Sequence, residues 1–163
     1  PLEMKGLEQI ILYTEPFYVA TNNQHHFAKK SKIKKEDLRD ETLLLLGEGH
    51  CLRGQVLDVC SYAMTKERKD FQGTSLETIR HMVSTGIGIT LIPQTAIDFK
   101  NLNQNSSIKY IPFIKPAPAR SVGLLFRKTS NRKVCFQNLA GLIQKIIQKE
   151  FSIKETVEII PVK

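Results

Sequence analysis

Short apolar runs alternate with amphipathic segments along the chain, and this alternation limits the possible folds more than any other feature. The apolar runs have the length of strands: residues 7–13, 17–21, 43–46, 87–92, 109–113 and 121–126. Apolar residues at helical spacing occupy three further segments: residues 52–66, 76–83 and 136–151. Strands that alternate with helices predict an α/β fold with a largely parallel sheet.

Several residues predict where these elements begin and end. Glu15 and Pro16 separate the first two apolar runs, so we expect two strands there. Thr74, followed three positions later by Glu77, has the pattern of a capping box with Thr74 as the cap. Gly86 favours the left-handed conformation that ends a helix. Two shorter helical turns are expected at residues 35–39 and 94–99.

Composition indicates a water-soluble globular protein. Of its 163 residues, 41% are hydrophobic and 25% are charged, close to the average for that class. The apolar runs are far shorter than the roughly 20 residues that cross a bilayer, and residues 1–6 do not resemble a signal peptide. Three cysteines are too few, and odd in number, for a secreted disulfide scaffold. We therefore expect a cytoplasmic protein without a membrane partner.

The net charge of +8 raises the question of nucleic-acid binding. Basic residues cluster in 29–39, but only Phe27 stands near them as an aromatic neighbour. The chain shows no zinc-finger spacing, no helix-turn-helix pattern and no aromatic ribonucleoprotein signature. We interpret the basic segment as a solvated face rather than a phosphate-binding patch.

Common cofactor and catalytic motifs are not found. Gly86 and Gly88 do not form a dinucleotide fingerprint, because Gly86 is expected to end a helix rather than to open one. The chain has no Cys-x-x-Cys and no Gly-x-Ser-x-Gly, so zinc and serine-hydrolase chemistry are not indicated. Its histidines lack the spacing of zinc ligands: His25, His26, His50 and His81. The sequence therefore predicts no metal and no cofactor.

Cys51 is the strongest candidate for chemistry. It lies where a strand and a glycine-containing loop give way to a helix, beside His50 and Arg53. The positive end of the helix and these two side chains favour the thiolate over the thiol. A thiolate is the form that attacks peroxide and becomes a sulfenic acid.

Cys60 follows nine residues later, and the spacing allows two interpretations. Nine helical residues rise about 13.5 Å, whereas a disulfide requires Cα atoms within roughly 7 Å. Pairing of Cys51 with Cys60 would have to unwind the helix, which couples oxidation to refolding. On spacing alone, two ordinary buried cysteines are the favoured interpretation. Cys135 has no second cysteine near it in the sequence and is interpreted as a core or surface thiol.

Three segments carry a resemblance to a known family. They are LLLLGEGHCLRGQVLDVC at 43–60, TSLETIRHMVSTGIGITLIP at 74–93 and YIPFIKPAPARSVGLLFRK at 110–128. They resemble the regulatory domains of LysR-type transcriptional regulators. The GHCLR block with a second cysteine nine residues on is similar to the peroxide-responsive members of that family.

The resemblance implies a fold like that of periplasmic binding proteins, with two Rossmann-like lobes. By that template residues 1–12 end the first lobe, residues 13–118 form the second, and residues 119–163 return to the first. The first lobe would be incomplete in this chain. The family's winged helix-turn-helix, its linker helix and the opening half of the first lobe have no counterpart here, so DNA would be bound by an N-terminal domain of the full protein.

The resemblance also assigns roles to individual residues. Cys51 matches the peroxide-reacting cysteine and Cys60 its resolving partner. Three residues match the pocket around the reactive sulfur: His50, Arg53 and Arg127. Two more match the general effector cleft of the family: Thr74 and Ser75.

Gly54 is a departure from the peroxide-responsive pattern, because an aspartate is frequent at this place. Glycine in the first turns weakens a helix, and loss of the acid removes a favourable charge near its N-terminus. We therefore expect residues 52–60 to unwind more easily than in relatives that have the aspartate.

These features predict the redox-sensing regulatory domain of a peroxide-responsive transcription factor, not an enzyme. In it, a Cys51–Cys60 disulfide would refold residues 51–60 and alter subunit packing. Two alternatives stay open: a LysR-type domain that binds a small anionic effector, and a thiol peroxidase. The resemblance implies dimers, tetramers of the full-length protein, contact with RNA polymerase, and glutaredoxin or thioredoxin as reductant.

Overall fold

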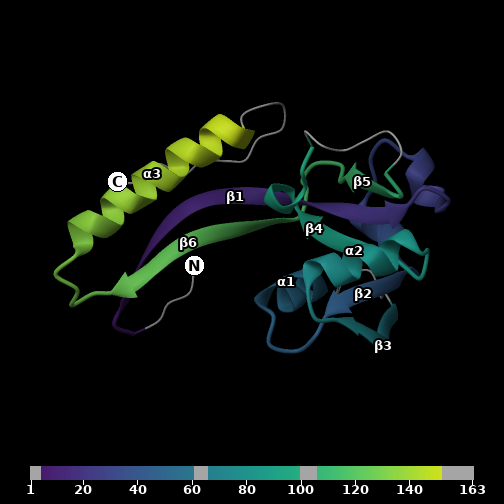
Figure 1. Cartoon of the computed structure of the whole chain (residues 1–163), viewed down its shortest axis with the longest axis horizontal. Helices are drawn as coiled ribbons and strands as arrows, with labels where there is room; N and C mark the ends of the chain where they lie inside the picture. Colours follow the sequence, from purple (N-terminus) through teal and green to yellow (C-terminus); the bar gives the residue numbers. More distant parts are fainter. Residues whose placement is uncertain (1–4, 61–65, 100–105, 152–163) are drawn as a thin grey trace. The chain divides into compact units, whose positions relative to one another are not determined.

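The chain forms two compact units. Unit 1 comprises Pro1–Pro16 and Ala119–Lys163, and unit 2 comprises Phe17–Pro118 (Figure 1). A computed structural model describes residues 5–60, 66–99 and 106–151, without the side chains of 66–72. Within these residues, no helix is long and apolar enough to cross a membrane.

One long strand, β1 (Leu7–Asn22), belongs to both units. Its first part pairs antiparallel with β6 (Ala119–Arg127), and its second part pairs antiparallel with β4 (Thr90–Pro93) and β5 (Ile108–Pro112). The prediction of two separate strands is therefore wrong. Pro16 has no N–H to donate, but it lies where β1 changes partners, so its missing hydrogen bond does not interrupt the strand.

The strands of unit 2 are not largely parallel, because they form a parallel pair and an antiparallel sheet. β2 (Thr42–Leu46) runs parallel to β3 (Lys66–Gly73), and Ile89 forms a parallel bridge with Leu43. β1, however, runs antiparallel to β4 and β5. The sequence-based expectation fails here because β1 enters unit 2 from unit 1, whereas only strands joined by crossover helices must be parallel.

The helices of unit 2 follow the predicted pattern with shifted ends. α1 (Cys51–Cys60) does not extend to residue 66, because β3 begins there. α2 (Leu76–Ser84) is capped by Ser75 and not by Thr74, since the Ser75 hydroxyl accepts a hydrogen bond from the N–H of Thr78 at 3.1 Å. Gly86 follows with a φ of +82°, as predicted. Short 3₁₀ turns complete the unit: η1 (His26–Lys29), η2 (Lys35–Leu38) and η4 (Gln94–Ala96).

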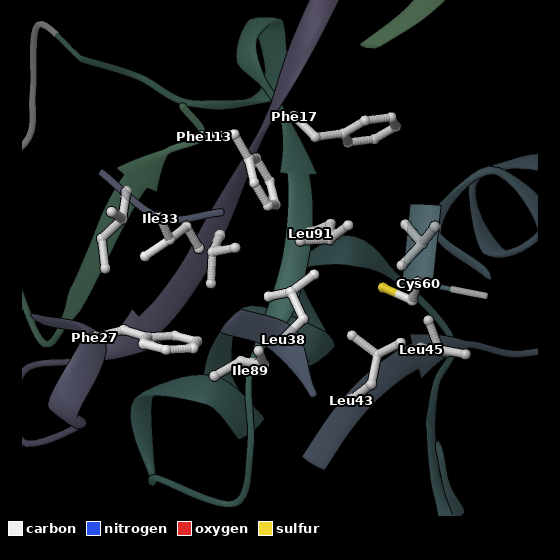
Figure 2. Packing of buried hydrophobic residues seen from close by; sticks show 13 residues of the cluster. Phe17, Phe27, Ile33, Leu38, Leu43, Leu45, Cys60, Ile89, Leu91 and Phe113 are labelled. Atoms are coloured by element: carbon white, nitrogen blue, oxygen red, sulfur yellow. The ribbon is translucent and has the colours of Figure 1, made fainter. Parts of the chain in front are cut away.

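The four leucines of β2 are buried on both faces of the strand. Leu43 and Leu45 pack into a cluster that includes residues of α1, and Leu44 and Leu46 pack into a second cluster with residues of α2. Figure 2 shows the first of these clusters, in which side chains from β1, β2, β4 and α1 meet. β2 is therefore a buried strand that anchors both helices.

The basic segment after β1 forms turns with its own ion pair. Lys30 Nζ lies 3.4 Å from Asp37 Oδ1, and the N–H of Lys34 donates to Asp37 Oδ2 at 2.8 Å. This backbone hydrogen bond is the main cause that holds the pKa of Asp37 below its ordinary value. Most of the lysines in the segment are exposed, consistent with a solvated basic face.

Unit 1 packs α3 (Lys133–Phe151) against the pair β1–β6. Buried Gln144 donates from Nε2 to the carbonyls of Ile11 and Leu12, each at 3.3 Å, where the β1–β6 register shifts. The helix was predicted, but its apolar residues do not all face the sheet. Ala140, Ile143 and Ile147 pack against it, whereas three others stay largely exposed: Leu139, Leu142 and Ile146.

Candidate functional site

Two loops of unit 2 meet at one edge of the sheet. β2 and β3 are parallel and end together at the pair Leu46–Gly73, and the N–H of Gly47 donates to the carbonyl of Gly73 at 3.0 Å. Each strand is followed by a loop and the N-terminus of a helix, α1 or α2. In open α/β sheets this edge is the usual place for ligands and reactive groups.

Cys51 is the first residue of α1 and is exposed. Gly49, with a φ of +90°, turns the chain from the loop into the helix. The N–H of Arg53 donates to the carbonyl of His50 at 3.0 Å, which closes the first turn. The sulfur-bearing residue therefore lies at the positive end of α1, beside an exposed His50.

Arg53 turns back toward the sheet. Its guanidinium donates to the carbonyl of Leu46 at 3.3 Å, and its side chain is half-buried. It lines a small recess between α1, α2 and the sheet that offers about 10 Å³, roughly room for one water molecule. The other lining residues are mostly apolar: Leu45, Leu46, Leu52, Val56, Leu76, Ile79, Thr90 and Leu91.

Cys60 has the opposite environment from Cys51. It is the last residue of α1 and is only 2% exposed. Figure 2 shows its sulfur directed into the cluster that contains Leu38, Leu45 and Leu91. Cys60 therefore contributes to the core of unit 2.

The two cysteines lie at opposite ends of one intact helix. Neither forms a disulfide, and the ten residues of α1 separate them by about 13.5 Å along the axis. Because a disulfide needs Cα atoms within roughly 7 Å, the arrangement corresponds to the dithiol state. Cys135, also a thiol, is exposed near the start of α3 in unit 1.

The other predicted site residues have mixed positions. Thr74 is exposed at the same sheet edge as the loop before Cys51, but the hydroxyl of Ser75 is engaged as the cap of α2. Arg127 is an exposed residue at the end of β6, in unit 1, opposite Leu7 in the strand register. The sequence analysis did not predict that Arg53 shares a recess with Leu76 and Thr90. A parallel pairing of β2 and β3 would have indicated it, because it brings the N-termini of α1 and α2 to the same edge of the sheet.

Comparison with known proteins places this geometry in a family. The LysR substrate-binding domain family matches residues 1–146. The reduced form of the OxyR regulatory domain from Pseudomonas aeruginosa is similar with a TM-score of 0.75 and 36% identity, over 89% of this chain and 69% of that one. The chain belongs to the OxyR regulatory domains of the LysR family.

Further similarities agree with this membership. The crystal structure of the oxidized form of OxyR matches with a TM-score of 0.77 and 35% identity, over 93% of this chain and 70% of that one. A probable hydrogen peroxide-inducible genes activator of Mycobacterium avium is 38% identical over 94% of this chain. The chain spans 49% of that relative, about half its length. The predicted family and fold class are thus confirmed.

Proposed function

We propose that this chain is the peroxide-sensing part of a transcription regulator, in which Cys51 reacts with hydrogen peroxide and Cys60 resolves the product. The observation that carries the proposal is the placement of an exposed and a buried cysteine at the two ends of one ten-residue helix. The similarity to OxyR in reduced and oxidized forms supports the same assignment.

The reaction takes two electrons from the cysteine pair. The Cys51 thiolate attacks one peroxide oxygen, the O–O bond breaks, and hydroxide leaves and is protonated to water. The Cys60 sulfur then attacks the Cys51 sulfenic acid, forms the S–S bond and releases a second water. Return to the dithiol requires an external dithiol, for which glutaredoxin or thioredoxin is the proposed class of reductant.

Disulfide formation requires α1 to unwind, because its two ends must approach by several ångströms. Cys60 and Val56 would leave the cluster built on Leu43 and Leu45, and Leu52 would lose its contacts with both clusters of unit 2. A local redox event thus changes the packing of a whole helix. We propose that this change alters the packing of subunits in the full protein.

Supporting roles follow from the family resemblance and the local geometry. His50 and Arg53 flank Cys51, and Arg53 is held by Leu46, so we propose that both contribute to the peroxide pocket. We assign unit 1 to lobe I and unit 2 to lobe II. Arg127, which belongs to lobe I, is proposed to contribute to the peroxide pocket. Thr74 and Ser75 are proposed only as neighbours of the pocket, because Ser75 caps α2.

The remaining activity belongs to the whole protein. We propose that it is cytoplasmic, binds DNA through a domain outside this chain, forms dimers and tetramers, and contacts RNA polymerase. We propose no enzymatic role and no cofactor for peroxide sensing.

Addition of equimolar hydrogen peroxide to the reduced protein tests the proposal. We expect peptide mapping by mass spectrometry to find a Cys51–Cys60 disulfide formed in most chains. An effector-binding domain would leave both thiols unpaired and would show ligand-dependent thermal shifts even without its cysteines. A thiol peroxidase would consume many equivalents of peroxide with thioredoxin, whereas a sensor turns over slowly. Either result would contradict the proposal.

Gly54→Ala is expected to make the disulfide easier to reduce. Gly54 is exposed within α1, and an added Cβ would meet no atom within 4 Å. Alanine should stabilise the helix by about 1 kcal/mol. Because this favours the dithiol form, the reduction potential should rise by about 20 mV, measured by equilibration with glutathione. An unchanged potential would show that α1 keeps its helical structure in the oxidised state.

A further inference from the structure

Three side chains of unit 2 that have no role in the proposed peroxide reaction lie close together: His25, His26 and Glu41. His25 Nε2 lies 3.2 Å from Glu41 Oε2, and His26 Nε2 lies 3.2 Å from Glu41 Oε1. The two imidazole rings stack with centroids 4.4 Å apart and an interplanar angle of 30°. One ligand atom from each of the three residues lies within 4.8 Å of the others. Two nitrogen donors and a carboxylate therefore face a common space.

The arrangement is held by the surrounding structure. The N–H of His25 donates to Asn22 Oδ1 at 2.9 Å, and both rings pack against Phe27, which is only 1% exposed. The N–H of Glu41 donates to the carbonyl of Leu38 at 3.1 Å. Side-chain exposure is 21% for His25 and 16% for Glu41, but 64% for His26, so the cluster is open to solvent on one side.

We propose that His25, His26 and Glu41 bind a divalent transition-metal ion of the Zn²⁺ class. Two imidazoles and one carboxylate suit such ions, and zinc bonds to these atoms are about 2.0–2.1 Å long. In a tetrahedral site of that size, neighbouring ligand atoms are about 3.3 Å apart. The two N···O separations of 3.2 Å, each to a different oxygen of Glu41, are close to this value, so a small rotation of the carboxylate would bring one oxygen to an ion shared by both imidazoles. The open side next to His26 leaves the fourth position to water.

The ion must displace the proton that links His25 Nε2 to Glu41. His25 Nδ1 accepts a hydrogen bond from the N–H of Phe27 at 3.2 Å, so in this arrangement its proton is on Nε2. Metal binding at Nε2 moves that proton to Nδ1 and breaks the bond from Phe27. The turn keeps the bond from Ala28 N to the His25 carbonyl at 2.9 Å. We therefore expect a reversible site rather than one required for folding.

Titration of the reduced protein with Co²⁺ alone, as a spectroscopic substitute for Zn²⁺, tests this site. We expect one ion per chain, visible d–d bands, and no near-ultraviolet thiolate-to-cobalt charge-transfer band. His26→Ala and Glu41→Gln should weaken binding by at least about 100-fold, since loss of a ligand costs more than loss of a residue behind it. His81→Ala removes an exposed histidine outside the cluster and should leave binding unchanged.

A thiolate charge-transfer band, or undiminished binding by Glu41→Gln, would overturn the proposal. Thermal unfolding without metal shows whether each variant is folded, and a folded His26→Ala variant that binds Co²⁺ normally would also overturn it. The site is independent of the peroxide reaction. His26→Ala should therefore form the Cys51–Cys60 disulfide at the normal rate, so the two proposals can fail separately.

Discussion

Cys51→Ser is expected to abolish the reaction of the protein with equimolar peroxide, and Cys60→Ser is expected to stop the reaction at the sulfenic acid. Cys51 is exposed at the N-terminus of α1, so peroxide can reach its sulfur. Cys60 is 2% exposed, so peroxide does not reach its sulfur while α1 is folded. Intact-protein mass spectrometry distinguishes the products, because the wild-type chain loses two hydrogens and Cys60→Ser gains one oxygen.

Cys135→Ser is the matched control for this pair of variants. Cys135 is exposed, like Cys51, but it lies in unit 1 near the start of α3. We expect its replacement to leave the rate and yield of the disulfide unchanged. A dimedone adduct on Cys135 in the wild-type protein, or a disulfide that still forms in Cys51→Ser, would contradict the assigned roles.

Formation of a Cys51–Cys60 disulfide should also weaken the packing of the core. In the dithiol state Val56 and Cys60 fill a cluster with Leu43 and Leu45. Removal of buried side chains of this size leaves a cavity whose lining loses contacts. The proposed S–S bond must therefore offset this loss of packing, and any change that stabilises α1 favours the dithiol.

The sequence predicted the elements that local signals define. Residues 43–46 were predicted as a buried strand because four leucines ended by a glycine suit a central strand, and the structure places them in β2. Gly86 was predicted to end α2 because few other residues adopt its positive φ. Cys51 was predicted at a helix start, and α1 begins with it.

Long-range context explains what the sequence did not predict. Pro16 normally interrupts a strand, and only the change of partners from β6 to β4 and β5 makes it compatible with β1. Glu41 is fifteen or more positions from the two histidines that it contacts, so no local spacing indicates the cluster. The adjacent histidines were the only signal, and alone they were interpreted as having no zinc-like spacing.

Gly88→Ala is expected to destabilise the protein, because it adds a methyl group where the backbone of β2 is already in close contact. A Cβ at Gly88 would lie 2.5 Å from the carbonyl oxygen of Thr42 and 3.2 Å from Leu44 Cγ. That oxygen accepts a hydrogen bond from the N–H of Ile89 at 2.9 Å, and the N–H of Leu44 donates to the Ile89 carbonyl at 2.9 Å. Relief of the clash must move β2 away from Ile89 and weaken both bonds.

The free energy of unfolding is expected to fall by about 3–5 kcal/mol, from overpacking of about 1–3 kcal/mol together with about 1 kcal/mol for each of the two weakened hydrogen bonds. For a chain of this size the midpoint of thermal unfolding should fall by about 10 °C, measured by circular dichroism. Gly54→Ala is the matched control, because its added methyl group meets no atom and should raise the midpoint slightly. An unchanged midpoint for Gly88→Ala would mean that β2 is not held against Ile89. The sheet edge that carries the loop before Cys51 would then lack the support argued for it.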